Sequence, residues 1–155
     1  MDTSKLGRIG LAVVGGIATV LVAIQLVPYG HNHTNPPIMA EVKWDSAATH
    51  DLATRACLDC HSNETKWPWY SSVAPVSWLV RNHIDEGREM LNFSEMNRTY
   101  EEAGEAAETV EEGEMPPAYY TLLHPEARLS AAEKSQLVAG LTATLGGAER
   151  RRGQE

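Results

Sequence analysis

Two cysteines and a histidine stand together in the order Cys57-Leu58-Asp59-Cys60-His61. This C-x-x-C-H spacing is the attachment signature of c-type haem. Two thiols three residues apart on a helical turn can each form a thioether bond with one vinyl group of a haem. The imidazole that follows is then placed to bind the iron. The motif therefore predicts one haem c, covalent through Cys57 and Cys60, with His61 as an axial ligand.

Two other kinds of site use a similar cysteine spacing. A structural zinc site needs four ligands, commonly from a second pair of cysteines or histidines. The available histidines, His31 and His33, lie in a proline-rich stretch. A redox-active dithiol is typical of a thioredoxin-like βαβ unit, and the sequence shows no such pattern. Haem is the favoured interpretation, with zinc and a dithiol as the alternatives.

The composition excludes several classes of protein. The chain has 155 residues, of which 43% are hydrophobic and 22% charged, close to ordinary globular usage and too polar for a polytopic membrane protein. Its formal net charge of −8 argues against a nucleic-acid partner, because phosphate binding needs an excess of Lys and Arg. Two cysteines are too few for a disulfide scaffold.

A long apolar run precedes the motif. Residues 9–27 carry no charged side chain. At about 1.5 Å per residue they would form a helix of roughly 28 Å, close to the roughly 30 Å of a bilayer core. Lys5 and Arg8 precede the run, whereas residues 28–42 contain no Lys or Arg. The positive-inside rule therefore predicts a single transmembrane helix with residues 1–8 in the cytoplasm and the remainder in the periplasm.

A cleaved signal peptide would begin with the same charges. The apolar run is longer than the usual core of a signal peptide, and no clear Ala-x-Ala site precedes Pro28. We therefore expect an uncleaved anchor in the bacterial inner membrane, in contact with the lipid bilayer through residues 9–27.

The rest of the chain divides into a linker, a helical domain and a tail. Residues 28–43 are rich in Pro and Asn, which disfavour regular structure. Residues 44–147 show helical periodicity and no strand alternation, so the predicted fold is all-α. The predicted helices begin after the N-cap Asp45, near Pro75, after Thr99 with Glu102 as a capping box, and after Ser130 with Glu133, ending at Gly146-Gly147. Residues 148–155 are predicted to be a charged flexible tail.

The helical domain has a thin aliphatic core, and a large buried cofactor would supply the missing surface. The apolar faces that we predict are Val76, Val80, His83, Ile84, Gly87 and Leu91; Tyr100, Ala103, Ala107 and Val110; and Leu137, Val138, Leu141 and Leu145.

Further blocks lie on both sides of the motif. They are Asn35-Pro36-Pro37, Trp67-Pro68-Trp69-Tyr70, Ala74-Pro75-Val76-Ser77-Trp78, Leu91-Asn92-Phe93-Ser94, Glu114-Met115-Pro116-Pro117 and residues 120–130. Together with C-x-x-C-H they resemble the bacterial haem-binding domain of small membrane-anchored c-type cytochromes. The resemblance covers about residues 28–145, and it implies a cytochrome c-like domain with a single haem.

The second axial ligand decides the redox behaviour, because Met/His ligation raises the reduction potential and suits electron transfer. Met115 is the predicted ligand, since two prolines stiffen the segment after it and it lies in a block of the resemblance. The ordinary interpretation of such a methionine is a hydrophobic loop anchor. His83 is the main competitor, and Met90, Met96, His124 or an open site are the others.

The remaining candidates surround the haem or orient its ligand. The second ring nitrogen of His61 needs a hydrogen-bond partner, which we expect to be the carbonyl of Pro75 or Pro68. Tyr120, Tyr119 or Arg81 would bond the propionates. The aromatic side chains expected to line the haem, or else simply to form core, are Trp67, Trp69, Tyr70 and Trp78.

These residues favour an electron carrier, and not an enzyme, that works by one-electron Fe(III)/Fe(II) cycling. Membrane or periplasmic redox proteins would be its partners. A peroxidase or gas sensor needs an iron position that opens, and no distal His-Arg pair is visible. An accessory subunit of a respiratory or photosynthetic complex is the third hypothesis, because small residues such as Ala12 and Gly16 suit helix packing in the membrane.

Seven glutamates precede Met115: Glu101, Glu102, Glu105, Glu108, Glu111, Glu112 and Glu114. Four of them, at positions 101, 105, 108 and 112, would share one face of one helix. The ordinary interpretation is a solvated face. The sharper one is a docking patch for a basic redox partner such as a cationic cytochrome.

Overall fold

The computed structural model describes residues 3–152, and over this range its regular structure is helical apart from one bridge between Ala40 and Glu95. The predicted all-α class is confirmed. The contacts divide the chain into two compact units. The anchor unit comprises the residues up to Thr34 together with Trp67–Asn82, and the motif unit comprises Asn35–Lys66 and the residues from His83 onward.

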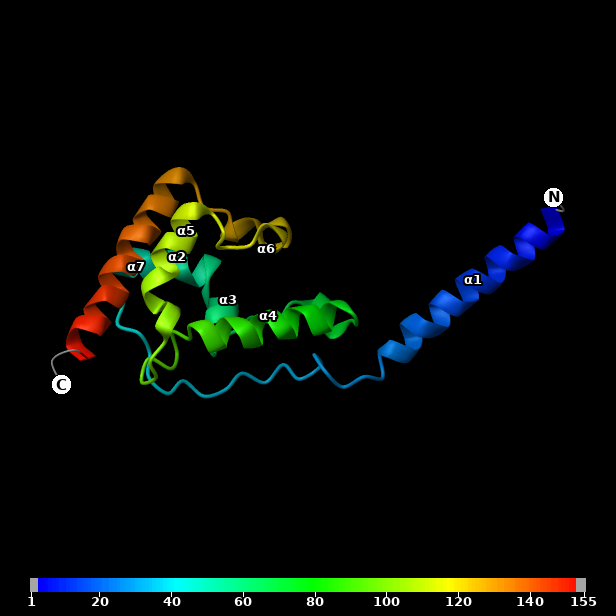
Figure 1. Ribbon diagram of the computed structural model, residues 1–155, viewed down its shortest axis with the longest axis horizontal. Helices are drawn as coiled ribbons and strands as arrows, with labels where there is room; N and C mark the ends of the chain where they lie inside the picture. Colours follow the sequence, from blue (N-terminus) through cyan, green and yellow to red (C-terminus); the bar gives the residue numbers. More distant parts are fainter. Residues whose placement is uncertain (1–2, 153–155) are drawn as a thin grey trace. The chain divides into compact units, whose positions relative to one another are not determined.

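The anchor unit begins with α1, Thr3–Ile24, drawn in blue in Figure 1. Within it, Lys5–Ile24 is long and apolar enough to cross a membrane. The helix ends three residues before the predicted boundary, because Pro28 has no N–H to donate to the Ile24 carbonyl; Val27 N–H donates to that carbonyl instead, at 3.2 Å. The unit also contains the 3₁₀ turn η1, Trp69–Ser72, and the first half of α4, Val76–Met90.

The motif unit contains the second half of α4 and five further α-helices. These are α2 (Ala47–Ala56), α3 (Leu58–His61), α5 (Ala106–Glu112), α6 (Ala118–Leu123) and α7 (Ala131–Arg152). Two 3₁₀ turns, η2 (Glu101–Glu105) and η3 (Pro125–Ala127), complete it.

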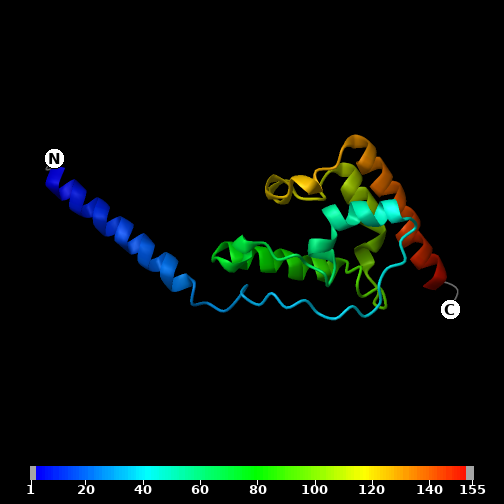
Figure 2. The same cartoon turned by 180° about the vertical axis from the view of Figure 1, so that it is seen from behind.

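The core of the motif unit lies among α2, α5 and α7, which are neighbours in both views (Figures 1 and 2). Gly140 permits the close crossing of α2 and α7, because a Cβ at this position would overlap the Thr49 side chain. The predicted apolar face of α7 is buried, with Leu137, Leu141 and Leu145 at its centre. The other predicted core residues Tyr100, Ala103 and Val110 pack against it.

The predicted helix starts are partly right. The capping box of α7 is confirmed: Ser130 N–H donates to Glu133 Oε2 at 2.8 Å, and Glu133 N–H donates to Ser130 Oγ at 3.3 Å. For α2, Asp45 is the wrong N-cap, because Ser46 Oγ accepts the Thr49 N–H at 3.2 Å. Asp45 N–H donates instead to Thr144 Oγ1 of α7.

The predicted third helix is wrong in its first half. Residues 101–105 form the 3₁₀ turn η2, with Tyr100 at its N-cap, where an α-helix was expected. Gly104 is a poor α-helix former and lies inside this turn. Helix α5 therefore begins only at Ala106, and α6, which follows a proline at its N-cap, was not predicted.

The predicted end of the last helix is also wrong. Helix α7 continues through Gly146-Gly147 to Arg152. Each glycine costs a helix only about 1 kcal/mol, and the Ala, Glu and Arg residues that follow are good helix formers. The last three residues of the predicted tail, 153–155, lie outside the described residues.

The predicted linker is extended and hydrogen-bonded. Its second half belongs to the motif unit, where Val42 N–H donates to Phe93 O at 2.8 Å and Met96 N–H donates to Ala40 O at 2.8 Å. The short bridge of Ala40 to Glu95 continues this pairing. It brings the segment that follows α4 against the chain that leads into α2.

Candidate functional site

The two cysteines lie on one continuous turn at the junction of α2 and α3. Cys57 is the C-cap residue of α2, and its N–H donates to Ala53 O at 2.8 Å. Its carbonyl then accepts the N–H of Cys60 at 3.1 Å and of His61 at 2.9 Å. Both thiols are free and half-buried. The backbone therefore presents two thiols and one imidazole within a single turn.

The ring of His61 is oriented by a main-chain carbonyl. Its Nδ1 lies 3.0 Å from Leu91 O, and its own carbonyl accepts the N–H of Phe93 at 2.8 Å. Burial lowers the pKa of His61, which favours the neutral imidazole. With the proton placed on Nδ1 for the bond to Leu91, Nε2 keeps the lone pair that a metal requires. The expectation that Pro75 or Pro68 supplies this carbonyl is wrong: Leu91, just after the end of α4, supplies it.

Gly87 explains how Leu91 reaches the histidine. A Cβ at Gly87 would lie 2.9 Å from the carbonyl oxygen of Cys60, closer than real side chains approach. The last turns of α4 can therefore pack directly on α3. The predicted apolar stripe included Gly87 and Leu91, but periodicity gave no sign that one is a contact point and the other a hydrogen-bond acceptor.

The thiols do not have the environment of a redox dithiol. Burial, with a smaller contribution from Cys60, raises the pKa of Cys57 to about 12. Burial and the Asp59 carboxylate raise the pKa of Cys60 to about 11. Reactive dithiols have a lowered pKa, so this environment argues against that alternative. Among the described residues, no group of three or more His, Cys, Asp and Glu could hold a metal ion.

Arg88 of α4 holds the residues that follow the motif. The side chain is buried, with Nε donating to Ser62 O at 2.9 Å and Nη2 donating to Thr65 Oγ1 at 3.0 Å. Nη2 also donates to Asn35 Oδ1 at 3.2 Å. Thr65 Oγ1 in turn donates to Asp59 O, at 2.7 Å, inside the C-x-x-C-H turn. A buried guanidinium thus joins the turn to α4 and to the linker.

A second buried network uses amide side chains. Asn63 Nδ2 donates to Pro37 O at 2.9 Å, and Asn92 Nδ2 donates to Asn63 Oδ1 at 2.8 Å. Ser94 Oγ accepts the N–H of Asn63 at 3.0 Å. The Asn-Pro-Pro and Leu-Asn-Phe-Ser blocks of the sequence therefore form the frame that fixes the chain just after His61.

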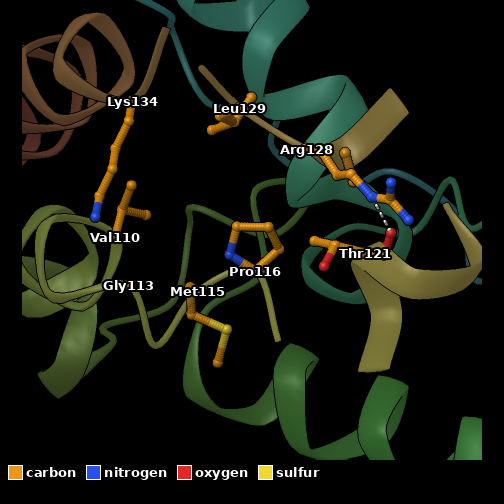
Figure 3. A pocket seen from close by; sticks show the side chains of 9 residues that line it. Val110, Gly113, Met115, Pro116, Thr121, Arg128, Leu129 and Lys134 are labelled. Carbon is orange, nitrogen blue, oxygen red and sulfur yellow. Dashed lines mark hydrogen bonds between the residues drawn. The ribbon is translucent and has the colours of Figure 1, made fainter. Parts of the chain in front are cut away.

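Met115 lies in the bend between α5 and α6. Gly113 ends α5 in the left-handed conformation, with φ of 85°, and the N–H groups of Glu114 and Met115 then donate to Thr109 O at 3.0 and 3.1 Å. The side chain is 38% exposed. It borders a pocket of about 260 Å³. Figure 3 shows its thioether extending away from Leu129 on the other side of this pocket.

Helix α6 connects the Met115 bend to the C-x-x-C-H turn. Tyr120 Oη donates to Asp59 Oδ2 at 2.8 Å. Burial and the Asp59 carboxylate raise the pKa of Tyr120, so its hydroxyl stays protonated. The neighbouring Tyr119 stacks on His83 of α4, with its hydroxyl 3.1 Å from Nδ1. Tyr120 was expected to bond a propionate; in this structure its hydroxyl is bound to Asp59.

The structure thus collects five predicted site residues, Cys57, Cys60, His61, Met115 and Tyr120, in the motif unit. The other five, Trp67, Trp69, Tyr70, Pro75 and Trp78, belong to the anchor unit. For the four aromatic residues among them, the expected role at a haem stays a prediction.

Local contacts of these aromatic residues differ. Trp67 stacks on His33 with ring centroids 4.5 Å apart, and Trp69 meets Tyr70 edge to face. Trp69 is 82% exposed. The indole Nε1 of Trp78 is buried and has no hydrogen-bond partner in the described part of the chain.

The donor set of the motif unit fits a covalently bound haem. A haem brings four nitrogen ligands of its own, so the protein needs to supply only axial ligands and two thiols. Sequence comparison agrees: the model of a family described as the haem-binding domain matches residues 19–143. Searches among curated proteins and among solved structures returned no match.

Proposed function

The chain belongs to the haem-binding domain family, and we propose that it is a membrane-anchored mono-haem c-type cytochrome that transfers electrons. The observation that supports this most is the C-x-x-C-H turn. Cys57 and Cys60 are free on one turn, and the Nδ1 of His61 is already bonded to Leu91. Haem, when bound, supplies an iron that gains and loses one electron at a time.

The chain's own residues would hold and orient this group. Cys57 and Cys60 would anchor it through thioethers, and His61 would bind through Nε2 while the Leu91 carbonyl fixes the ring. The frame around Arg88 and Asn63 would keep the turn in place in both oxidation states. A rigid site favours electron transfer, because the protein then rearranges little when the charge of the iron changes.

Met115 is the proposed second axial ligand. Its bend is stiffened by the two prolines after it and by the hydrogen bonds to Thr109. Tyr120 ties the helix that follows to Asp59 of the motif turn. A methionine held on this segment would hold the iron together with His61, and an iron with both protein ligands suits a carrier better than a peroxidase or gas sensor.

The membrane part of the proposal concerns α1. Its length and apolar composition are those of a transmembrane helix, and cleaved signal sequences share them. The contacts of Gln25 favour retention: its side chain bonds both main-chain groups of Ala74, which ties the end of α1 to the anchor unit. We place the N-terminus in the cytoplasm and the motif unit in the periplasm, where redox proteins of the membrane or periplasm are the partners.

A spectroelectrochemical titration of the full chain in detergent tests the function. We expect one reversible transition that fits the transfer of a single electron. The spectra of the oxidised and of the reduced protein should both be those of low-spin haem. Rapid binding of carbon monoxide to the reduced protein, or turnover with peroxide, would contradict a closed electron-transfer site. Co-purification with a respiratory or photosynthetic complex after mild extraction would favour the accessory subunit instead.

A further inference from the structure

A segment of the anchor unit is uncharged and apolar at its surface. Residues 67–80, between Lys66 and Arg81, contain no Asp, Glu, Lys or Arg and hold three of the four tryptophans. Trp69 is 82% exposed and Val73 45% exposed, and the side chains of Val76 and Leu79 are exposed as well. These four exposed apolar side chains lie within eleven residues of sequence, and exposed apolar surface that is clustered marks a contact with a partner or a membrane.

The same segment is bonded to the end of α1. Gln25, the first residue after the helix, donates from Nε2 to Ala74 O at 3.0 Å. Its Oε1 accepts the N–H of Ala74 at 2.9 Å. The side-chain amide of Gln25 thus forms hydrogen bonds with both main-chain polar groups of Ala74. The main chain of Ala74 therefore lies within the length of one side chain from the end of α1.

Three further contacts follow along the chain. Gly30 has φ of 82°, and a Cβ there would lie 2.6 Å from Ser77 O, so the two backbones touch. The ring of His33 lies 3.1 Å from Ser71 O and stacks on Trp67. Residues 25–33 therefore do not act as a free spacer; they lie along residues 67–80.

We propose that residues 69–76 are a membrane-interface contact that rests in the headgroup region beside the anchor. This rests on the proposed spanning of the bilayer by α1. A helix of about 20 residues matches the hydrocarbon thickness, which puts Gln25 at the interface. The two hydrogen bonds to Gln25 place Ala74 at the same depth in the bilayer. Trp69 and Val73 lie close to Ala74 in the chain, so we expect them at the interface as well.

The chemistry of the segment fits this place. Tryptophan and tyrosine are enriched at membrane interfaces, where the apolar ring is buried and the polar edge stays wet. Tyr29 and Leu26, both exposed, lie next to the end of α1 and add to the same belt.

Site-directed spin labelling tests the proposal on the haem-loaded full chain in phosphatidylcholine–phosphatidylglycerol vesicles. Labels are placed by Trp69→Cys and by Val73→Cys, both at exposed positions. Val20→Cys in α1 is the membrane control, and Gln136→Cys on the exposed side of α7 is the aqueous control. Unsubstituted protein, whose two thiols would carry haem, controls for background labelling.

For each label we measure the ratio of its collision rate with oxygen to its collision rate with a water-soluble nickel chelate. We expect this ratio to be several-fold higher at positions 69 and 73 than at position 136. Nickel-accessible labels at 69 and 73, together with a lipid-embedded label at 20, would overturn the interface contact and leave the anchor standing. Labels at 69 and 73 shielded from both reagents would also overturn it, since haem or protein would then cover the segment. A nickel-accessible label at 20 would refute the anchor and this proposal with it.

Discussion

Met115 carries the most specific prediction at the scale of single residues. Its side chain lies on a segment that Thr109 and Tyr120 hold in place through the hydrogen bonds on either side of it. Met115→Ala should convert low-spin ferric haem to a high-spin form and remove the weak long-wavelength band of methionine ligation. An optical spectrum of the oxidised protein measures both.

Met90→Ala and Met96→Ala serve as matched controls, because they remove a thioether elsewhere in the motif unit. The band should survive in both. If it survives in Met115→Ala and vanishes in one of the controls, the sulfur has been assigned to the wrong residue.

Arg88 gives a prediction about stability. Its guanidinium is buried and donates to Ser62, Thr65 and Asn35, so Arg88→Ala would leave these oxygens without their donor. We expect the free energy of unfolding to fall by at least about 3 kcal/mol, because three hydrogen bonds are lost and a single hydrogen bond to a charged group contributes about 1.5–3 kcal/mol. Denaturant unfolding of the haem-loaded protein measures it. Arg81→Ala in the anchor unit is the control, and equal losses in the two variants would contradict the special role of Arg88.

At the scale of residues, sequence patterns identify candidate reactive side chains but not the groups that hold them in place. Cys57, Cys60 and His61 are recognisable because thioether formation and metal binding require those side chains at that spacing. Leu91 acts through its carbonyl, which every residue has, so no side-chain pattern could identify it. Arg88 lies on a helix with ordinary amphipathic spacing, and its burial depends on where the linker passes.

At the scale of elements, the start of α7 makes stability depend on pH. Hydrogen bonds from Ser130 and from Arg55 lower the pKa of Glu133 from 4.5 to about 2. A lowered carboxyl pKa contributes stability that is present above pH 4.5 and is lost as the pH falls toward 2. Glu133→Gln should therefore lower the Tm at pH 6 and flatten its fall between pH 5 and pH 3.

Thermal unfolding across this pH range provides the measurement. Glu111→Gln, which removes an exposed carboxylate from α5, is the control for net charge. A pH profile of Glu133→Gln that parallels the unsubstituted protein would show that the cap does not contribute through its charge.

The elements show where sequence patterns are reliable. The capping box at Ser130 and Glu133 is a local interaction, and the structure contains it. The similar pattern at Thr99 is followed by a 3₁₀ turn and not by an α-helix, since Gly104 is a poor α-helix former and Tyr100 is held in the core. Helix α6 has only six residues, too few for its periodicity to be visible, and its tyrosines form hydrogen bonds with Asp59 and His83, which are distant in the sequence.

At the scale of the whole molecule, the acidic surface bears on the choice of partner. Glu101, Glu105, Glu108 and Glu112 are exposed, although they lie on η2 and α5 and not on the single helix expected. If the patch steers a basic partner, electron transfer to a cationic cytochrome should slow as salt rises, because charges are screened over about 10 Å at 0.1 M. Changing all four to Gln should flatten that dependence.

Stopped-flow rates at several salt concentrations measure this effect. Glu41→Gln combined with Glu64→Gln, both exposed elsewhere on the motif unit, is a control for nonspecific charge. If the salt response of the fourfold variant is identical to that of the unsubstituted protein, the glutamates are not a docking patch and form only a solvated face.

The proposed function depends on attachment of haem through both cysteines of the C-x-x-C-H turn. The most direct test is the intact mass of the full chain, measured after denaturation and acid–acetone extraction, for the unsubstituted protein and for Cys57→Ala combined with Cys60→Ala. We predict the chain mass plus one haem for the first and the bare chain mass for the second. Haem retained by the double variant, or absent from the unsubstituted protein matured in a host that attaches haem c, would contradict the claim.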